Sequence, residues 1–383
     1  KLLGARVDYY VPDRQTEGYG LNAGALQNLL AAGTELLLTV DCGISAAEEI
    51  GDISRQLDVI VTDHHQVPAV LPPAYAVIDP QRPDCSYPDK NLAGVGVAFK
   101  LGQALYRHCE KAESILYDFM DIVSIGTIAD IVPLIGENRI LVKLGLKKLR
   151  TTTNIGLRAL LKVCGLDNAS LDAGKIGFVV APRLNAAGRL GTATTGIELL
   201  LAAEEAKADK LAEELERENR RRQEIGREIE LQAENLIYQQ GREHDRVLVV
   251  AGEGWHIGVI GIVASRLVEK FYRPVVIISL TAGIGKGSGR SIPGFDLYRA
   301  LALTGDLLIR FGGHKQAAGL SITADNIDEF RKTLNEIAAS TLTAEDFCPV
   351  LKIDAAVALR EINEGFINQL ASLAPYGIGN PKP

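Results

Sequence analysis

The sequence predicts an α/β protein in which a domain built on a parallel sheet is joined by a long helix to a smaller α/β domain. Within residues 1–80, hydrophobic runs that suit strands alternate with segments of helical spacing, which is typical of a parallel sheet with crossover helices. Residues 203–240 are nearly all Ala, Glu, Lys, Arg, Gln and Leu, with no proline and a single Gly226, so they predict one continuous helix. A polar helix of that length is most simply a connector between domains.

The part before the long helix divides into an alternating region and a helical region. The alternating region is expected to hold strands at 5–11, 35–40, 57–62 and 75–79, and helices near 22–32 and 45–55. From Gly94 to about Leu200 the apolar residues recur every three or four positions, which predicts helices. Residues 1–12 resemble the end of a helix followed by a strand, and no Met opens the chain. We therefore expect further chain upstream of Lys1.

A second α/β unit follows the long helix. Its expected elements are strands at 246–250, 274–280 and 284–290 and helices at 257–271 and 325–340. The whole chain is thus expected to divide into segments 1–202, 203–240, 241–345 and 346–383. The last of these segments begins another small unit.

Composition and charge are those of an ordinary globular protein. Hydrophobic residues make up 47% and charged residues 23% of the 383 residues, which allows two or three domains with full cores. No stretch reaches the roughly 18 uncharged apolar residues of a membrane helix, and the first residues lack the features of a signal peptide. The five cysteines form no Cys-x-x-Cys pair, so we expect reduced thiols and a cytoplasmic location. The net charge of −7 by itself argues against nucleic-acid binding, although local basic patches can still bind phosphate.

Polar residues with metal-binding side chains follow three hydrophobic runs, each of which suits a strand. Asp41 ends the first run, Asp63-His64-His65 the second and Asp130 the third. In an open α/β sheet, ligands gather at the carboxyl ends of the strands, so we expect Asp41, His65 and Asp130 to converge on one point. Carboxylate and imidazole groups together suit a divalent ion such as Mn²⁺. Two or more such ions commonly serve to split phosphate esters, so the pattern favours a metal-dependent phosphoesterase.

Each of the three segments also has a simpler explanation. A lone Asp after a strand is most often a turn residue or a helix N-cap. Adjacent histidines are usually an accident of the surface. The metal interpretation depends on the occurrence of all three segments together.

Two glycine-rich segments are candidates for phosphate binding. The first, 283–291, fails the P-loop pattern, because residue 280 is Leu and Lys286 is followed by Gly. A glycine-rich edge strand would explain it, but Arg290 and Ser291 could instead present charge and a hydroxyl to a phosphate. The second, 312–319, is expected to form a turn whose backbone N–H groups bind an anion, with His314 and Lys315 as further donors.

Three more arginines lie in segments expected to be basic, glycine-containing turns. Arg183 and Arg189 belong to one such turn, and Arg14 to another. Each turn alone would more often be structural. Together with the two glycine-rich segments they suggest a track for substrate phosphates around the metal site.

Several motifs together resemble the DHH phosphoesterases, and within them the bacterial nucleases specific for single-stranded DNA. The motifs are Asp63-His64-His65, Ala129-Asp130, 312–319 (GGHKQAAG), 11–14 (VPDR) with 17–20 (EGYG), 183–189 (RLNAAGR), 255–261 (WHIGVIG) and 373–381 (LAPYGIGNP). This resemblance covers essentially the whole chain. It implies that residues 1–202 are a DHH domain and 241–345 a DHH-associated substrate-binding domain, facing each other across a groove. It also implies that 346–383 begins an OB-fold.

The resemblance assigns roles to the candidate residues. It implies that Asp41, His65 and Asp130 bind the metal, and that Asp63, His64 and His314 act in catalysis. The residues implied to bind substrate are Arg14, Arg183, Arg189, Arg290, Ser291 and Lys315, with His314 also at a phosphate. The family's first motif, an Asp-x-Asp that supplies metal ligands, has no counterpart after Lys1, which leaves the activity of this chain on its own open.

The resemblance implies a single-stranded-DNA-specific 5′→3′ exonuclease that uses two Mn²⁺ or Mg²⁺ ions in DNA recombination and repair. Single-stranded DNA is the expected partner, a single-strand-binding protein and a helicase are further candidates, and a monomer is expected. One alternative is a DHH phosphodiesterase for short RNA or a cyclic dinucleotide, and the long polar helix weighs against it. Another is a DNA-binding scaffold with a decayed site, which the intact Asp63-His64-His65 opposes.

Overall fold

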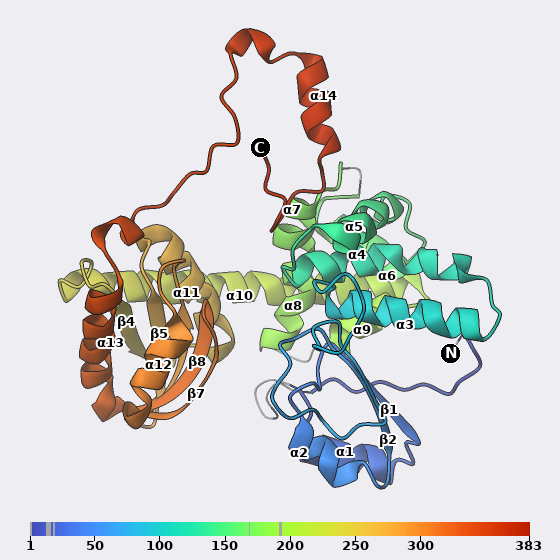
Figure 1. The fold of residues 1–383 in the computed structure, drawn as a ribbon, viewed down its shortest axis with the longest axis horizontal. Coiled ribbons are helices and arrows are strands. Elements are labelled where there is room, and N and C mark those ends of the chain that lie inside the picture. The colour runs from blue at the N-terminus through green and yellow to red at the C-terminus, as the bar shows by residue number, and fades with distance from the viewer. Residues whose placement is uncertain (1, 13–16, 18–19, 168, 191–193) are drawn as a thin grey trace. The chain divides into compact units, whose positions relative to one another are not determined.

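The computed structural model describes the chain except residues 1, 13–16, 18–19, 168 and 191–193. It divides into two compact units (Figure 1). The first unit comprises Lys1–Asn219 with Ala355–Pro383, and the second comprises Arg220–Asp354. None of the helices in the described part of the chain is long and apolar enough to cross a membrane.

The first unit begins with a three-stranded parallel sheet. Its strands are β1 (Leu36–Val40), β2 (Asp58–Thr62) and β3 (Ala76–Ile78), in the order β1-β2-β3. Helices α1 (Ala23–Ala31) and α2 (Ala47–Ile53) pack on β2 through a shared apolar core (Figure 1). Val40 pairs in register with Thr62, and Thr62 with Ile78, so the three strands end at one edge. The expected alternation of strands and helices is confirmed from residue 22 onward.

One expected strand is absent. Described residues 5–11 form neither a strand nor a helix, so the prediction of a strand there is wrong. The segment has the composition of a strand, but Tyr9 and Tyr10 are exposed and no strand of the sheet pairs with it. Without a partner, a strand's backbone hydrogen bonds are not made.

The rest of the first unit is helical, as expected. The main helices are α3 (Gly94–His108), α4 (Met120–Ala129), α5 (Gly136–Leu149), α6 (Ile155–Val163), α8 (Ala181–Leu190) and α9 (Thr194–Leu200). Shorter turns are η1 (Glu113–Phe119), α7 (Ala173–Lys175) and the π-helical η2 (Ile176–Val180). The apolar run before Asp130 is therefore the helix α4 and not a strand. Because α4 is buried on several sides, its sequence is continuously apolar, and periodicity alone does not distinguish such a helix from a buried strand.

Helix α4 is held by close contact with α5 at Gly145. A Cβ atom added at Gly145 would lie 2.2 Å from the carbonyl oxygen of Met120 and 2.3 Å from Cβ of Ser124. We expect Gly145→Ala to destabilise the protein by about 1–3 kcal/mol, because the two helices would have to separate. Gly102→Ala is the matched control. Gly102 lies inside α3, and a Cβ atom added there would lie 3.8 Å from Leu116, an ordinary contact distance. Urea unfolding should show a loss for Gly145→Ala and none for Gly102→Ala, and equal tolerance of both changes would contradict this packing.

Helix α10 (Glu205–Gln239) confirms the expected long helix almost to the residue. It contributes residues to both units, because the division between them falls after Asn219.

The second unit is a five-stranded sheet in the order β4-β5-β6-β8-β7. Its strands are β4 (Leu248–Glu253), β5 (Val275–Thr281), β6 (Ile284–Arg290), β7 (Leu308–His314) and β8 (Ala317–Thr323). Its helices are α11 (Ile257–Phe271), α12 (Leu297–Leu303) and α13 (Ile327–Thr341), with short turns η3 (Gly305–Leu307), η4 (Ala324–Asn326) and η5 (Ala344–Phe347). Only β4 and β5 pair in parallel; the other pairs are antiparallel.

Strand β6 is not an edge strand, contrary to the simpler of the two explanations considered for it. It pairs with β5 on one side and β8 on the other. Its glycines leave room for apolar side chains, since a Cβ at Gly287 would lie 2.8 Å from Leu320 and one at Gly289 would lie 2.7 Å from Leu297. The glycines therefore serve packing inside the sheet.

The last part of the chain returns to the first unit. It contains η6 (Leu359–Glu361) and α14 (Glu364–Ser372), followed by a tight turn in which Gly377 bridges to Asn380. After α14 the chain runs back to α5, where Nη2 of Arg139 donates to the carbonyl oxygen of Leu373. The beginning of an OB-fold at 346–383 stays a prediction.

Candidate metal centre

Asp63 fixes the loop that carries the two histidines. Its side chain is only 1% exposed, and its Oδ2 accepts a hydrogen bond from the backbone N–H of Ile44 at 2.9 Å. Its Oδ1 accepts from the backbone N–H groups of His64 (2.8 Å) and His65 (3.2 Å) and lies 2.7 Å from Nδ1 of His65. Burial alone would raise the pKa of Asp63, but the hydrogen bonds from His65, Ile44 and His64 lower it. Asp63 is therefore an ionised carboxylate whose hydrogen bonds fix the backbone of the loop and the ring of His65.

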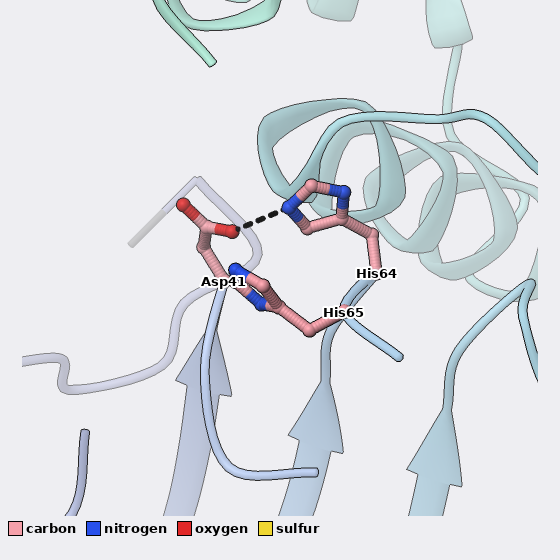
Figure 2. Close-up of side chains that lie close together, drawn as sticks. All are labelled: Asp41, His64 and His65. Carbon is pink, nitrogen blue, oxygen red and sulfur yellow. Dashed lines mark ion pairs between the residues drawn. The ribbon is translucent and has the colours of Figure 1, made fainter. Parts of the chain in front are cut away.

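Three side chains meet above this loop. Asp41, His64 and His65 each offer one possible metal ligand, and these atoms lie within 4.8 Å of one another (Figure 2). Nε2 of His64 lies 3.0 Å from Oδ1 of Asp41 and 3.2 Å from Oδ2 of Asp130. The cluster thus joins the ends of β1 and β2 to the C-terminal end of α4.

Backbone geometry brings Asp41 into this position. Asp41 follows β1 with a φ of 63°, in the left-handed region that non-glycine residues seldom occupy. Gly94, the first residue of α3, leaves space for it, since a Cβ there would lie 2.5 Å from Oδ1 of Asp41. A conformation this unusual, kept beside a group of charged side chains, is typical of a functional site.

The cluster fits a divalent cation. Two carboxylates approach one nitrogen of His64, and a single N–H cannot donate a full hydrogen bond to both. Burial lowers the pKa of His64, but the carboxylates of Asp41 and Asp130 more than offset this and raise it, so the site favours positive charge. Carboxylate oxygens with imidazole nitrogens are a ligand set that suits Mn²⁺.

A further carboxylate lies at the same edge of the sheet. Asp79 directly follows β3 and is 2% exposed. Burial raises its pKa, and the charge of Asp63 adds to this effect. Oδ1 accepts from the backbone N–H of Gln81, while among the described residues Oδ2 has no hydrogen-bond partner. No motif in the sequence singles out Asp79, although it lies at the end of an expected strand as Asp41 does.

The structure assembles the predicted residues with one difference of arrangement. Asp41, His65 and Asp130 are the residues expected to converge as ligands, and His64 is expected to act in catalysis. All four lie together, but His64 is the histidine that contacts both Asp41 and Asp130, whereas Nδ1 of His65 is bound to Asp63.

Two expected substrate contacts in the first unit are placed differently from the prediction, and one is not placed. Arg14 lies outside the described residues. Arg183 and Arg189 lie within helix α8 and not in a turn, so that expectation is wrong. The guanidinium of Arg183 donates to Oε2 of Glu216 at 2.5 Å and to the carbonyl oxygen of Val179 at 2.6 Å, which ties α8 to α10.

Arg290, the last residue of β6, and the following Ser291 are both hydrogen-bonded within their own unit. Arg290 donates to its neighbour Gly289 (carbonyl oxygen, 2.8 Å), and burial lowers its pKa. The hydroxyl of Ser291 donates to the carbonyl oxygen of Phe295 at 2.8 Å.

Residues 312–319 form a hairpin. Gly312 pairs with Gly319 across β7 and β8, so the turn is shorter than expected and much of the backbone of 312–319 is used in the strand ladder; anion binding there stays a prediction. The tip of the hairpin is Lys315-Gln316, and His314 and Lys315 are exposed.

Comparisons with known proteins agree with this architecture. A model of the DHH family, N-terminal domain, matches residues 1–127, and a model of the DHHA1 domain matches residues 244–340. The single-stranded-DNA-specific exonuclease RecJ of Dickeya dadantii (strain 3937) is 41% identical over 399 residues, which cover 99% of this chain and 69% of that protein. The chain belongs to the RecJ family of DHH proteins.

Other RecJ proteins extend the likeness to structure. RecJ of Bacillus subtilis (strain 168) is 43% identical, over 100% of this chain and 48% of that protein. The crystal structure of RecJ from Thermus thermophilus in complex with Mn²⁺ matches 94% of this chain and 53% of that chain, with a TM-score of 0.83 and 35% identity. The chain thus spans about half the length of these two RecJ proteins.

Membership of the RecJ family confirms the resemblance to DHH phosphoesterases and the fold class, a parallel-sheet domain and a smaller α/β domain connected by a long helix. The Thermus RecJ structure holds Mn²⁺, and the cluster of Asp41, His64 and His65 could hold such an ion here.

Proposed function

We propose that this protein is a metal-dependent exonuclease that hydrolyses phosphodiester bonds of single-stranded DNA from the 5′ end, in DNA recombination and repair. The observation that carries the proposal is the meeting of Asp41, His64 and Asp130 at the carboxyl edge of a parallel sheet, with separations of 3.0 and 3.2 Å about one histidine nitrogen. The RecJ relatives, named as single-stranded-DNA-specific exonucleases, support the choice of substrate.

Four side chains would hold the metal: Asp41, Asp130, His64 and His65. Two Mn²⁺ or Mg²⁺ ions are expected from the sequence. When bound, they would lower the pKa of a bound water and neutralise negative charge on the phosphate. Asp63 positions both histidines through its hydrogen bonds, and so acts in support of the ligands.

We propose substrate-phosphate contacts for cationic and hydroxyl groups of both units. These are Arg14, Arg189, Arg290, Ser291, His314 and Lys315. Such groups stabilise negative charge that develops on a phosphate. Arg183 is excluded from this set because Glu216 already binds its guanidinium.

The test of the proposal is digestion of DNA labelled at one end. With Mn²⁺, we expect mononucleotides to be released from the 5′ end of single-stranded DNA, blunt duplex to be spared, and a chelator to stop the reaction. Release from the 3′ end would overturn the polarity. A preference for dinucleotides over longer strands would favour the small-substrate phosphodiesterase instead, and DNA binding without hydrolysis would favour the scaffold.

We further propose that the enzyme works as a monomer in the cytoplasm and meets a single-strand-binding protein and a helicase there. The free cysteines, Cys42, Cys85, Cys109, Cys164 and Cys348, support a reducing compartment.

A further inference from the structure

The C-terminal part of the first unit packs on the loop that follows Asp130. We name residues 373–380 the latch segment and residues 130–135 the Asp130 loop. The backbone N–H of Leu134 donates to the carbonyl oxygen of Ile378 at 2.7 Å, and Nη2 of Arg139 donates to the carbonyl oxygen of Leu373 at 2.8 Å. The partners of the second bond lie 234 positions apart in the chain, so no local signal in the sequence announces this contact.

Side chains fit closely between the two segments. A Cβ added at Gly377 would lie 2.7 Å from Cδ1 of Leu134, and one at Gly379 would lie 3.3 Å from Pro133 and from Ile135. Leu134 is 3% exposed and belongs to the apolar core that also contains Ile125 of α4. The latch segment therefore rests on a residue that connects the Asp130 loop to the core.

The latch segment is also ordered within itself. The side-chain amide of Asn380 donates to the carbonyl oxygens of Leu373 (2.9 Å) and Pro375 (2.8 Å). Gly377 and Asn380 exchange two backbone hydrogen bonds, of 2.9 and 3.1 Å. These internal hydrogen bonds fix the conformation of the latch segment where it contacts Leu134.

The Asp130 loop needs such support because its backbone is strained. Ile131, directly after Asp130, has a φ of 62° and a side chain that is 67% exposed. A β-branched residue in the left-handed region is strained and persists only where its surroundings hold it. The loop is held on its other side by Asn138, whose amide donates to the carbonyl oxygen of Pro133 at 3.1 Å.

We propose that the latch segment is a positioning element for Asp130. By fixing Leu134 it keeps the strained loop in the conformation that places Oδ2 of Asp130 3.2 Å from Nε2 of His64. This inference rests on the proposed function, in which Asp130 is a metal ligand. Groups that orient ligands from outside the ligand set typically contribute about 10- to 100-fold to metal affinity.

The test compares two latch variants with one control. Gly377→Val inserts a side chain against Leu134, and Arg139→Gln removes the hydrogen bond to Leu373. Ile378→Ala is the control, because the side chain of Ile378 is 52% exposed and only its carbonyl makes the contact. The readouts are hydrogen exchange of the Leu134 amide and the Kd for Mn²⁺ measured by calorimetry without DNA, with thermal unfolding as a check of the fold.

We expect both latch variants to speed exchange at Leu134 and to raise the Kd for Mn²⁺ about tenfold, while the control changes neither. Faster exchange with a Kd that stays close to that of the unaltered protein overturns the positioning role. Unchanged exchange in both variants overturns the contact itself. If Gly377→Val fails to fold, Arg139→Gln decides the outcome.

Asp130→Asn, measured in parallel, separates this inference from the proposed function. An unchanged Kd in Asp130→Asn overturns the ligand role of Asp130, and with it the inference. A raised Kd in Asp130→Asn, with unchanged values in both latch variants, overturns the inference alone.

Discussion

Replacement of His64 by alanine is expected to lower Mn²⁺-dependent hydrolysis of single-stranded DNA by about a hundred- to a thousandfold. His64 contacts both Asp41 and Asp130, so its loss removes one ligand and leaves two carboxylates facing each other. A metal ion contributes several kcal/mol of charge stabilisation in the transition state, and each step of about 1.36 kcal/mol is a factor of ten in rate.

The control for this change is His244→Ala. The side chain of His244 is 87% exposed and its ion pair with Glu243 is 4.0 Å long. Initial rates at saturating Mn²⁺ should fall only for His64→Ala. Equal rates for both variants would remove His64 from the site.

Replacement of Asp63 by asparagine is expected to destabilise the protein by about 3 kcal/mol and to reduce activity as well. The side-chain NH₂ of the new asparagine would face a backbone N–H that now donates to Asp63, such as that of Ile44. A buried backbone N–H left without an acceptor costs about 1–3 kcal/mol. Loss of the charge-assisted bond to His65 adds to this. Asp58→Asn, at the exposed start of β2, should change stability by less than about 0.5 kcal/mol.

The effect of Asp63→Asn should depend on pH. The pKa of Asp63 is lowered from its ordinary 3.8 in the folded protein. Its ionised form therefore stabilises the fold fully above that value, and the contribution is lost as the pH falls through the lower folded pKa. Urea unfolding at several pH values should show the two proteins converge in acid. If the difference in unfolding free energy between the two proteins stayed constant down to the lowest pH measured, the charge of Asp63 would not have this stabilising role.

Local sequence was sufficient to predict the strands that position the site. The apolar runs before Asp41 and Asp63 end where parallel strands end, and the register of β1 and β2 brings the two residues to one edge. The same reasoning reaches Asp79, which was missed because no motif drew attention to it.

Other features depend on contacts that local sequence does not encode. Which histidine faces Asp41 and Asp130 is decided by the hydrogen bonds of Asp63, which hold His65 by its Nδ1. Strands β7 and β8 were missed because the glycines that suggested a turn lie within a strand ladder. The contact between Leu134 and Ile378 joins distant parts of the chain.

The position of Mn²⁺ in crystals of this protein, located by its anomalous scattering, tests the central claim most directly. A metal centre formed by this cluster predicts a peak about 2.0–2.3 Å from donor atoms of Asp41 and Asp130 and from at least one nitrogen of His64 or His65. The absence of any peak at these four side chains, at a Mn²⁺ concentration that supports hydrolysis, would contradict it.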